Sequence, residues 1–222
     1  MIATPTPAAS GNVSVEFFDR QFRTQPGAAA LALNPFEQVA LPHLAGTVLD
    51  FGCGLGNLAF AAARRGCTVT ALDASPAAIE HVRARAAVER LPVTAARADL
   101  RAYTIAGDYD GVVSIGLLMF FDCARALAVL DDLKAHVRPG GVCAVNVLVE
   151  GTTFLDMFDP GAHCLFPPGL LATRFADWQV LHADLRDFAA PGGTVKRFAT
   201  VIARRPPAPP NDDARPAAGR RA

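Results

Sequence analysis

The sequence has no excess of charge of either sign. Its 21 lysines and arginines balance 21 aspartates and glutamates, so the formal net charge is zero and the sequence pI is about 7.0. A basic surface is the electrostatic footprint of a nucleic-acid-binding protein. We therefore expect no nucleic-acid partner.

Long apolar runs are also absent. No stretch approaches the roughly 20 apolar residues that cross a bilayer, and the opening MIATPTPAASGN lacks the basic-then-apolar order of a signal peptide. We therefore expect no membrane partner and a cytoplasmic location. The residues 1–13 and the proline-rich segment 205–222 are expected to be a disordered leader and tail.

Cysteine is scarce and odd in number. The five cysteines form no C-x-x-C pair, and they are Cys53, Cys67, Cys123, Cys143 and Cys164. This pattern disfavours both a zinc site and a secreted disulfide framework. We expect no bound metal, and we expect most of the cysteines to be small buried apolar residues in a reducing compartment.

The sequence does contain a regular alternation of short apolar runs and helical stretches. Ser75 and Asp122 are typical N-cap residues for two of the helices, and a further helix is predicted at about 56–65. RPGG at 138–141 predicts a turn. The apolar runs predict strands at 47–51, 67–72, 91–96, 109–116 and 142–149.

The alternation predicts a Rossmann-like, doubly wound α/β fold with a seven-stranded, mostly parallel sheet. After a short helix at about 168–175, two apolar runs joined by AAPGG predict a hairpin that adds an antiparallel C-terminal strand. Two helical pieces within 14–45 form an N-terminal cap. We expect one domain over residues 14–204.

Three glycines crowd the segment DFGCGLG at 50–56, directly after the first predicted strand. Glycine costs backbone entropy on folding, so such a cluster marks positive φ angles or close approach by another group. In an open α/β sheet, ligands bind at the carboxyl ends of the strands. The segment therefore predicts a ligand-binding turn.

Two ligands compete for this turn. GLGNLA at 54–59 matches the dinucleotide fingerprint, and Asp73 follows at about the expected spacing, which leaves a nicotinamide-dependent oxidoreductase as an alternative. Asp50 would repel a pyrophosphate but attract an ammonium group. Asp73 can accept hydrogen bonds from a ribose diol, and Asp99 can accept one from an adenine amine. Together the three acids favour S-adenosylmethionine.

On these motifs the chain resembles the class I S-adenosylmethionine-dependent methyltransferases over about residues 14–204. DFGCGLG resembles the family's glycine motif, ARADLRAY its adenine-side motif, and YDGVVSIGLLMFF its fourth-strand motif. The resemblance implies S-adenosylmethionine as the cofactor and an arginine, here Arg23, that pairs with the cofactor carboxylate. The other implied binding residues are Asp50, Gly52, Cys53, Gly54, Asp73, Ala74, Asp99, Leu100, Ser114 and Ile115.

Within that superfamily, VVSIGLLMFF, WQVLHADL and KRFATVIARR are similar to the tellurite-resistance methyltransferase group. That group methylates soft nucleophiles such as oxyanions of tellurium and selenium. It carries a His-Arg pair before the last strand, where this chain has Leu185-Arg186, with His182 three residues earlier. The resemblance implies a small-molecule acceptor with a soft nucleophile, such as a thiol or a chalcogen oxyanion.

Candidate catalytic residues are few. His163 lies in the long segment 150–169, and His182 and Arg186 lie near the expected hairpin. The run 119–121, Met-Phe-Phe, can wall an acceptor pocket. We expect methyl transfer by a monomer or homodimer, and a non-catalytic S-adenosylmethionine-binding regulatory module stays open as a second alternative.

Overall fold

The computed structural model describes residues 13–24, 32–159 and 161–208. The segments expected to be disordered, 1–13 and 205–222, lie outside the described residues except for Val13 and residues 205–208. Residues 205–208 form no helix or strand.

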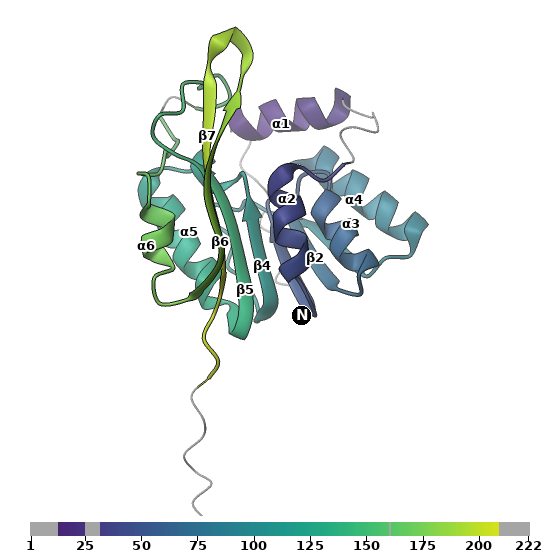
Figure 1. Ribbon diagram of the computed structural model, residues 1–222. Coiled ribbons are helices and arrows are strands. Elements are labelled where there is room, and N and C mark those ends of the chain that lie inside the picture. Colours follow the sequence, from purple (N-terminus) through teal and green to yellow (C-terminus); the bar gives the residue numbers. More distant parts are fainter. Residues whose placement is uncertain (1–12, 25–31, 160, 209–222) are drawn as a thin grey trace, which may run out of the picture.

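A seven-stranded sheet forms the centre of the fold, in the order β3-β2-β1-β4-β5-β7-β6 (Figure 1). Neighbours from β3 to β5 pair in parallel, and β7 pairs antiparallel with both β5 and β6. The predicted fold class, including the antiparallel strand from the C-terminal hairpin, is confirmed. The strands are Thr47–Phe51 (β1), Thr68–Asp73 (β2), Val93–Arg97 (β3), Tyr109–Ile115 (β4), Val137–Leu148 (β5), Gln179–Ala189 (β6) and Val195–Arg204 (β7).

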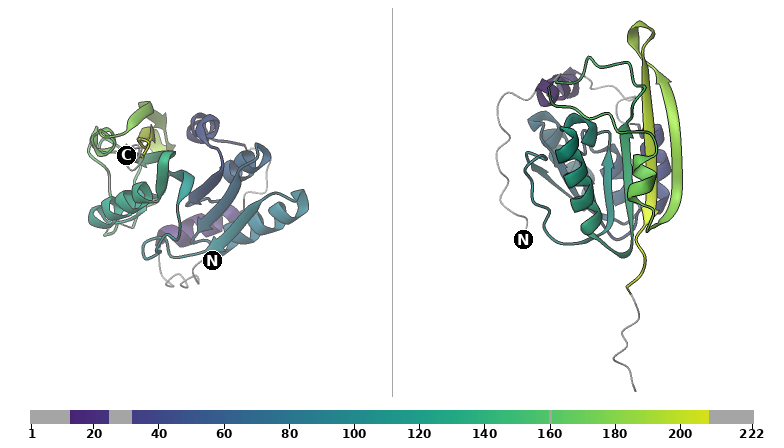
Figure 2. Two further views of the ribbon diagram at one scale, coloured as in Figure 1. Left: turned by 90° about the horizontal axis from the view of Figure 1, so that it is seen from below. Right: turned by 90° about the vertical axis from the view of Figure 1, so that its left-hand side faces the viewer.

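Helices cover both faces of the sheet (Figures 1 and 2). Those described, with three short 3-10 turns, are Val13–Thr24 (α1), Pro35–Ala40 (α2), Leu41–His43 (η2), Asn57–Arg64 (α3), Pro76–Glu89 (α4), Leu118–Phe120 (η3), Cys123–Ala135 (α5), Leu170–Arg174 (α6) and Pro191–Gly193 (η4). None of these helices is long and apolar enough to cross a membrane. Figure 1 shows α1 lying across the end of the sheet at which β4 points, beside the protruding β6–β7 hairpin.

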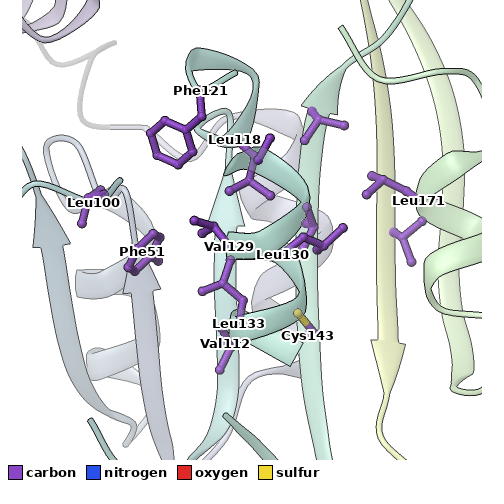
Figure 3. Packing of buried hydrophobic residues seen from close by; sticks show 14 of the residues in the cluster. Phe51, Leu100, Val112, Leu118, Phe121, Val129, Leu130, Leu133, Cys143 and Leu171 are labelled. Atoms are coloured by element: carbon purple, nitrogen blue, oxygen red, sulfur yellow. The ribbon is translucent and has the colours of Figure 1, made fainter. Parts of the chain in front are cut away.

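Two apolar layers fill the spaces between sheet and helices. On one face, Leu130 and Leu133 of α5 pack with Val112 and Cys143 of the sheet, as Figure 3 shows. On the other face, α3 and α4 bury a stripe that includes Ile79 and Val82 against alternate residues of the same strands. The central strands β1, β4 and β5 are buried on both faces, which explains why their sequences read as continuous apolar runs.

Local capping chemistry agrees with the sequence. The Ser75 hydroxyl accepts a hydrogen bond from the backbone N–H of Ala78 at 3.1 Å, and the Asp122 carboxylate accepts one from Arg125 at 2.9 Å. Both residues therefore cap their helices as predicted, α4 and α5 respectively.

The prediction of a turn at 138–141 is wrong, because these residues belong to a strand. β5 begins at Val137 and continues through these residues, with a register shift in its pairing with β4. Hydrogen bonds of 3.0 and 2.8 Å link Gly140 and Gly141 to Arg205 just beyond β7. Because these bonds satisfy the backbone between sheet neighbours, pairing overrides the local turn propensity.

The cysteine prediction needs one correction. Cys53, Cys67 and Cys143 are buried and free, as expected for most of the five. Cys123 and Cys164, however, form a disulfide between two residues 41 positions apart. The loop after β5 folds back onto the start of α5, and a backbone hydrogen bond of 3.0 Å from Cys164 to Met119 fixes this arrangement. Sequence spacing alone carries no sign of such a tertiary contact.

Candidate functional site

The glycine turn lies at the carboxyl end of β1, between the end of β2 and the end of β4. Gly52, Gly54 and Gly56 have φ angles of +90°, +51° and +75°, which side chains with a Cβ rarely adopt. The backbone N–H groups of Gly52 and Cys53 donate to the carbonyl of Leu72 at 2.8 and 2.9 Å. These bonds tie the turn to β2 and explain its tight curvature.

Neighbouring side chains also approach the turn closely. A Cβ built on Gly52 would lie 2.9 Å from a methyl carbon of Leu117, and one built on Gly54 would lie 3.4 Å from the ring of Phe22. Phe22 belongs to α1, so the N-terminal helix covers the turn. Gly52 and Gly54 therefore allow neighbouring side chains to approach closely, in addition to adopting the positive φ angles of the turn.

Asp73 ends β2 and is held rigidly at the same edge. One carboxylate oxygen accepts from the Gly54 N–H at 2.9 Å, and the other accepts from the Ser75 N–H at 2.8 Å. Burial raises the pKa of Asp73, and these backbone hydrogen bonds oppose that shift. Each oxygen retains a second lone pair, so the carboxylate can still accept hydrogen bonds from a ligand.

Asp50 lies beneath the turn and is only 5% exposed. Burial, together with the nearby charges of Glu37 and Asp73, raises the pKa of Asp50 to about 8. Burial also raises the pKa of Glu37 on α2. One buried and two half-buried carboxyl groups therefore lie near one another, an arrangement that a positive charge in the site would stabilise.

A cavity of about 650 Å³ opens above this edge of the sheet. Its first half, over β1–β3, is polar and lined by the glycine turn and by segments 73–75 and 99–101. Asp99 lies there beside Arg101, whose guanidinium Nε is 3.2 Å from the carboxylate. We call this part, made of residues 52–54, 73–75 and 99–101, the acid half.

The second half of the cavity lies over β4 and β7 and is mostly aromatic. Phe18 and Phe22 come from α1, Phe120 and Phe121 follow β4, and Lys196 comes from the start of β7. The rings of Phe18 and Phe120 meet edge to face, with their centroids 5.1 Å apart. We call this part the aromatic half. It confirms that the run at 119–121 contributes to a cavity wall, although Met119 itself is buried and does not line the cavity.

Comparison with known proteins agrees with this geometry. A family model described as a methyltransferase domain matches residues 48–141, the part that runs from β1 into β5. A probable S-adenosyl-L-methionine-dependent methyltransferase, TehB of Haemophilus influenzae, is 28% identical over 165 residues, which cover 71% of this chain and 57% of the relative. Residues 48–141 therefore form a methyltransferase domain of the S-adenosylmethionine-dependent type.

Other matches extend the comparison. Hemagglutinin 1 of Eikenella corrodens is 32% identical over 168 residues, covering 71% of this chain and 54% of that protein. The methyltransferase chain thus spans little more than half the length of these curated relatives.

Solved structures match the fold. The crystal structure of TehB from Haemophilus influenzae has a TM-score of 0.67 at 22% identity, over 86% of this chain and 67% of the other. The N-methyltransferase NodS from Bradyrhizobium japonicum, solved with S-adenosyl-l-homocysteine, also has a TM-score of 0.67, at 18% identity over 88% of this chain and all of the other.

The acid half of the methyltransferase cavity fits S-adenosylmethionine. The cofactor carries a sulfonium and an ammonium, and among the described residues no lysine, arginine or histidine forms an ion pair with the buried Asp50 or with the half-buried Glu37 and Asp73. Gly52 and Gly54, which carry no Cβ, both line the cavity. When bound, the cofactor supplies a methyl group already activated by the positive sulfur.

Most of the residues predicted to bind the cofactor come together in the methyltransferase. The structure places them around the acid half and at the end of β4: Gly52, Cys53, Gly54, Asp73, Ala74, Asp99, Leu100 and Ile115 all line the cavity. Cys53 contributes backbone, because burial and the neighbouring acids raise the pKa of its thiol well above the usual value. An ionised, reactive Cys53 is therefore disfavoured.

Three other predicted binding residues do not line the cavity. Asp50 lies below the turn, and Ser114 is fully buried with no hydrogen-bond partner for its hydroxyl among the described residues. The Arg23 side chain is 59% exposed and pairs with Asp19 at 2.9 Å, one helical turn away. Its side chain is directed along α1, so the expected pairing with the cofactor carboxylate has no geometric support.

The candidate catalytic residues also lie away from the cavity lining. His163 stacks on Phe158 with ring centroids 4.7 Å apart, and its Nδ1 lies 3.2 Å from the Asp159 carbonyl. On the edge strand β6, His182 and Arg186 both face Asp184, at 3.2 and 2.6 Å. None of these three candidate catalytic residues is among the described residues that line the cavity.

Sequence reasoning missed several residues of the site. Glu37 was overlooked because a glutamate at this position of α2 already has a local role in a capping box. The Asn34 N–H donates a hydrogen bond to its carboxylate at 2.7 Å. Leu117, within the segment that resembles the fourth-strand motif, and Asn34, the N-cap of α2, also line the cavity. Lys196 had one available signal: it is one of only two lysines in a chain rich in arginine, the other being Lys134.

Proposed function

We propose that the protein transfers a methyl group from S-adenosylmethionine to a small-molecule acceptor, acting as one domain over residues 14–204. The observation that carries this proposal is the set of buried acids around the glycine turn, with the pKa of Asp50 raised to about 8. Such a site stabilises a cationic adenosyl amino acid and disfavours the pyrophosphate of a dinucleotide.

The chemistry we propose is an in-line displacement at the activated methyl group. The protein's part is to hold donor and acceptor in line and to exclude water, and positioning of this kind can supply on the order of 7–11 kcal/mol at best. The acid half, with Asp73 and the turn at Gly52–Gly54, holds the donor. The aromatic half, with Phe18 and Phe120, holds the acceptor.

Within small acceptors we favour a soft nucleophile such as a thiol or a chalcogen oxyanion. A hydroxyl acceptor needs a general base, whereas a thiolate or an oxyanion already carries its electron pair. No histidine is among the described residues that line the cavity, and its two carboxylates, Asp73 and Asp99, both belong to the acid half. A soft acceptor is the one that this arrangement serves without a base.

The cytoplasmic location expected from the sequence stays a prediction. The bond between Cys123 and Cys164 weighs against it, because disulfides persist mainly in oxidising compartments. Alkylation of the thiols in freshly lysed cells, followed by mass spectrometry of the peptides, measures which state the protein has there.

The decisive experiment combines binding and transfer. Calorimetry with S-adenosylhomocysteine and with NAD should detect binding of the first alone, and binding of NAD alone would replace the proposal by an oxidoreductase. Metabolite extracts incubated with the protein and methyl-labelled S-adenosylmethionine should yield a labelled product. Tight cofactor binding with no transfer of label to any extract would instead identify a non-catalytic binding module.

A further inference from the structure

Lys196 differs from Arg101, the other cation among the described residues that line the cavity, because it has no carboxylate partner. The described residues that line the cavity include two cations, and the first of these, Arg101, is paired with Asp99 in the acid half. Lys196 instead lies at the start of β7, in the aromatic half. Among the residues that the structure describes, no carboxylate oxygen lies within 4.0 Å of its ammonium nitrogen.

The surroundings of Lys196 are apolar on the protein side. Its ammonium nitrogen lies 4.5 Å from the centroid of the Phe154 ring, and the rings of Phe18 and Phe120 line the same cavity. Burial lowers the pKa of Lys196 from its usual value. A partly buried ammonium with no anionic partner is costly unless a ligand supplies the charge.

The position of Lys196 separates it from the groups that bind the cofactor ribose. Four strand spacings lie between β2, which carries Asp73, and β7, which carries Lys196, or roughly 19 Å across the sheet. The aromatic rings lie over β4, between these two strands. Figure 2 (right) shows α1 and the β6–β7 hairpin on either side of this end of the sheet.

The second lysine gives an internal comparison. Lys134 also lies over aromatic rings, Phe175 and Trp178, but its ammonium group has protein partners: the carboxylate of Asp177 at 3.6 Å and the carbonyl of Arg174. Both lysines pack on rings, and the difference between them is the missing anion at Lys196.

We propose that Lys196 binds an oxyanion of the methyl acceptor, so that the acceptor is a small molecule with an apolar body and a carboxylate or similar acidic group. This inference rests on the proposed methyl transfer and specifies its substrate class. The rings at Phe18 and Phe120 would contact the apolar body, while the ammonium group of Lys196 would form a charge-assisted hydrogen bond with the acid. The cavity must also hold the cofactor, so the acceptor has to be small.

The test uses three aromatic thiols as probes: 4-mercaptobenzoate, its neutral amide 4-mercaptobenzamide, and thiophenol. Transfer from methyl-labelled S-adenosylmethionine is measured with the full chain, and binding of each probe to the S-adenosylhomocysteine complex is measured by calorimetry. We expect the benzoate to show a kcat/KM, or an affinity, at least tenfold above the amide. Lys196→Met should remove this preference through KM, and Lys196→Arg should keep most of it.

Lys134→Met is the matched control, and it should leave the preference for the acid unchanged. S-adenosylhomocysteine affinity should stay within twofold in Lys196→Met; a loss of fivefold or more would assign Lys196 to the cofactor carboxylate and overturn the inference. Equal use of acid and amide by the wild type, an acid preference that survives in Lys196→Met, or no binding of the benzoate at all would also overturn it. Methylation of thiophenol without any acid preference would leave the proposed methyl transfer intact, so the two failures are distinguishable.

Discussion

The two halves of the cavity are built in different ways. The acid half uses backbone N–H groups, carboxylates and glycines with positive φ, all from short strand-to-helix turns at the ends of β1, β2 and β3. The aromatic half gathers rings and one lysine from α1, the segment after β4 and the hairpin strand β7. The first half is therefore specified by local sequence, and the second by how distant segments pack.

The disulfide offers the largest test of this contrast, because it fixes only the aromatic half. Replacing Cys123 and Cys164 with serine frees a loop of 41 residues, and we expect the free energy of unfolding to fall by about 2–4 kcal/mol. In a domain of this size, that is a lowering of Tm by several degrees, measured by calorimetric or optical melting.

The affinity of the same double serine variant for the cofactor tests whether the acid half is independent of the disulfide. S-adenosylhomocysteine affinity of the double serine variant should stay within twofold of wild type. Reducing agent should lower the Tm of wild type and leave that of the variant unchanged. A parallel loss of cofactor affinity would contradict the separation of the two halves.

Asp73→Ala should have the largest effect on the acid half. The variant loses the acid that we propose binds the cofactor ribose, as well as the acceptor for the N–H groups of Gly54 and Ser75. We expect S-adenosylmethionine affinity to fall by tenfold or more, which corresponds to about 1.4 kcal/mol or above. Isothermal titration measures it, with Asp131→Ala as the control, since that carboxylate pairs with Arg174 away from the cavity. Unchanged affinity would remove Asp73 from the site.

The pH dependence of binding tests Asp50. Its carboxyl group, with a pKa of about 8, is mostly protonated at pH 7 in the free protein, while a bound cation favours the ionised form. Binding must therefore release a proton, and affinity should fall as the pH falls. Between pH 8 and pH 7 we expect about a fivefold loss of S-adenosylhomocysteine affinity. In Asp50→Asn the profile should be flatter, and an equally steep profile would mean that another group titrates.

Arg23→Ala should have the smallest effect. The side chain is mostly exposed and forms an ion pair within α1, an interaction that contributes no more than about 0.5 kcal/mol. Cofactor affinity should change by less than twofold in the same titration. A fivefold loss would restore the pairing between Arg23 and the cofactor carboxylate that the sequence suggested.

Much of the fold followed from local patterns. The strand at Thr47–Phe51 has the predicted limits, the caps at Ser75 and Asp122 act as expected, and the hairpin at the C-terminus is present. These features depend on residues within one element, so their chemistry is readable from the sequence. The exception, the RPGG segment, was misread because its glycines and proline favour a turn, whereas hydrogen bonds between its two glycines and Arg205 extend β5 through it.

The residues of the candidate site also fall into those that local sequence predicted and those that it did not. The residues that line the acid half were found because each strand end contributes its own short motif, as in the turn at 50–56 and Asp73. Arg23 and Arg186 were taken from the family resemblance, and His163 was chosen by residue type and its place in a long loop. The structure places all three outside the cavity lining, where each already has a protein partner. Residue type alone does not reveal which groups a fold leaves unpaired.

The sequence by itself determined the order of strands and helices, the bend of the glycine turn and the acids at the strand ends, because hydrophobic periodicity and positive φ angles are local properties. Only the tertiary structure decided that Cys123 meets Cys164, that Glu37 lies near Asp50, and that Lys196 faces the cavity without an anion. Each of these depends on the distance between residues far apart in the chain. Such distances are set by the packing of the whole core.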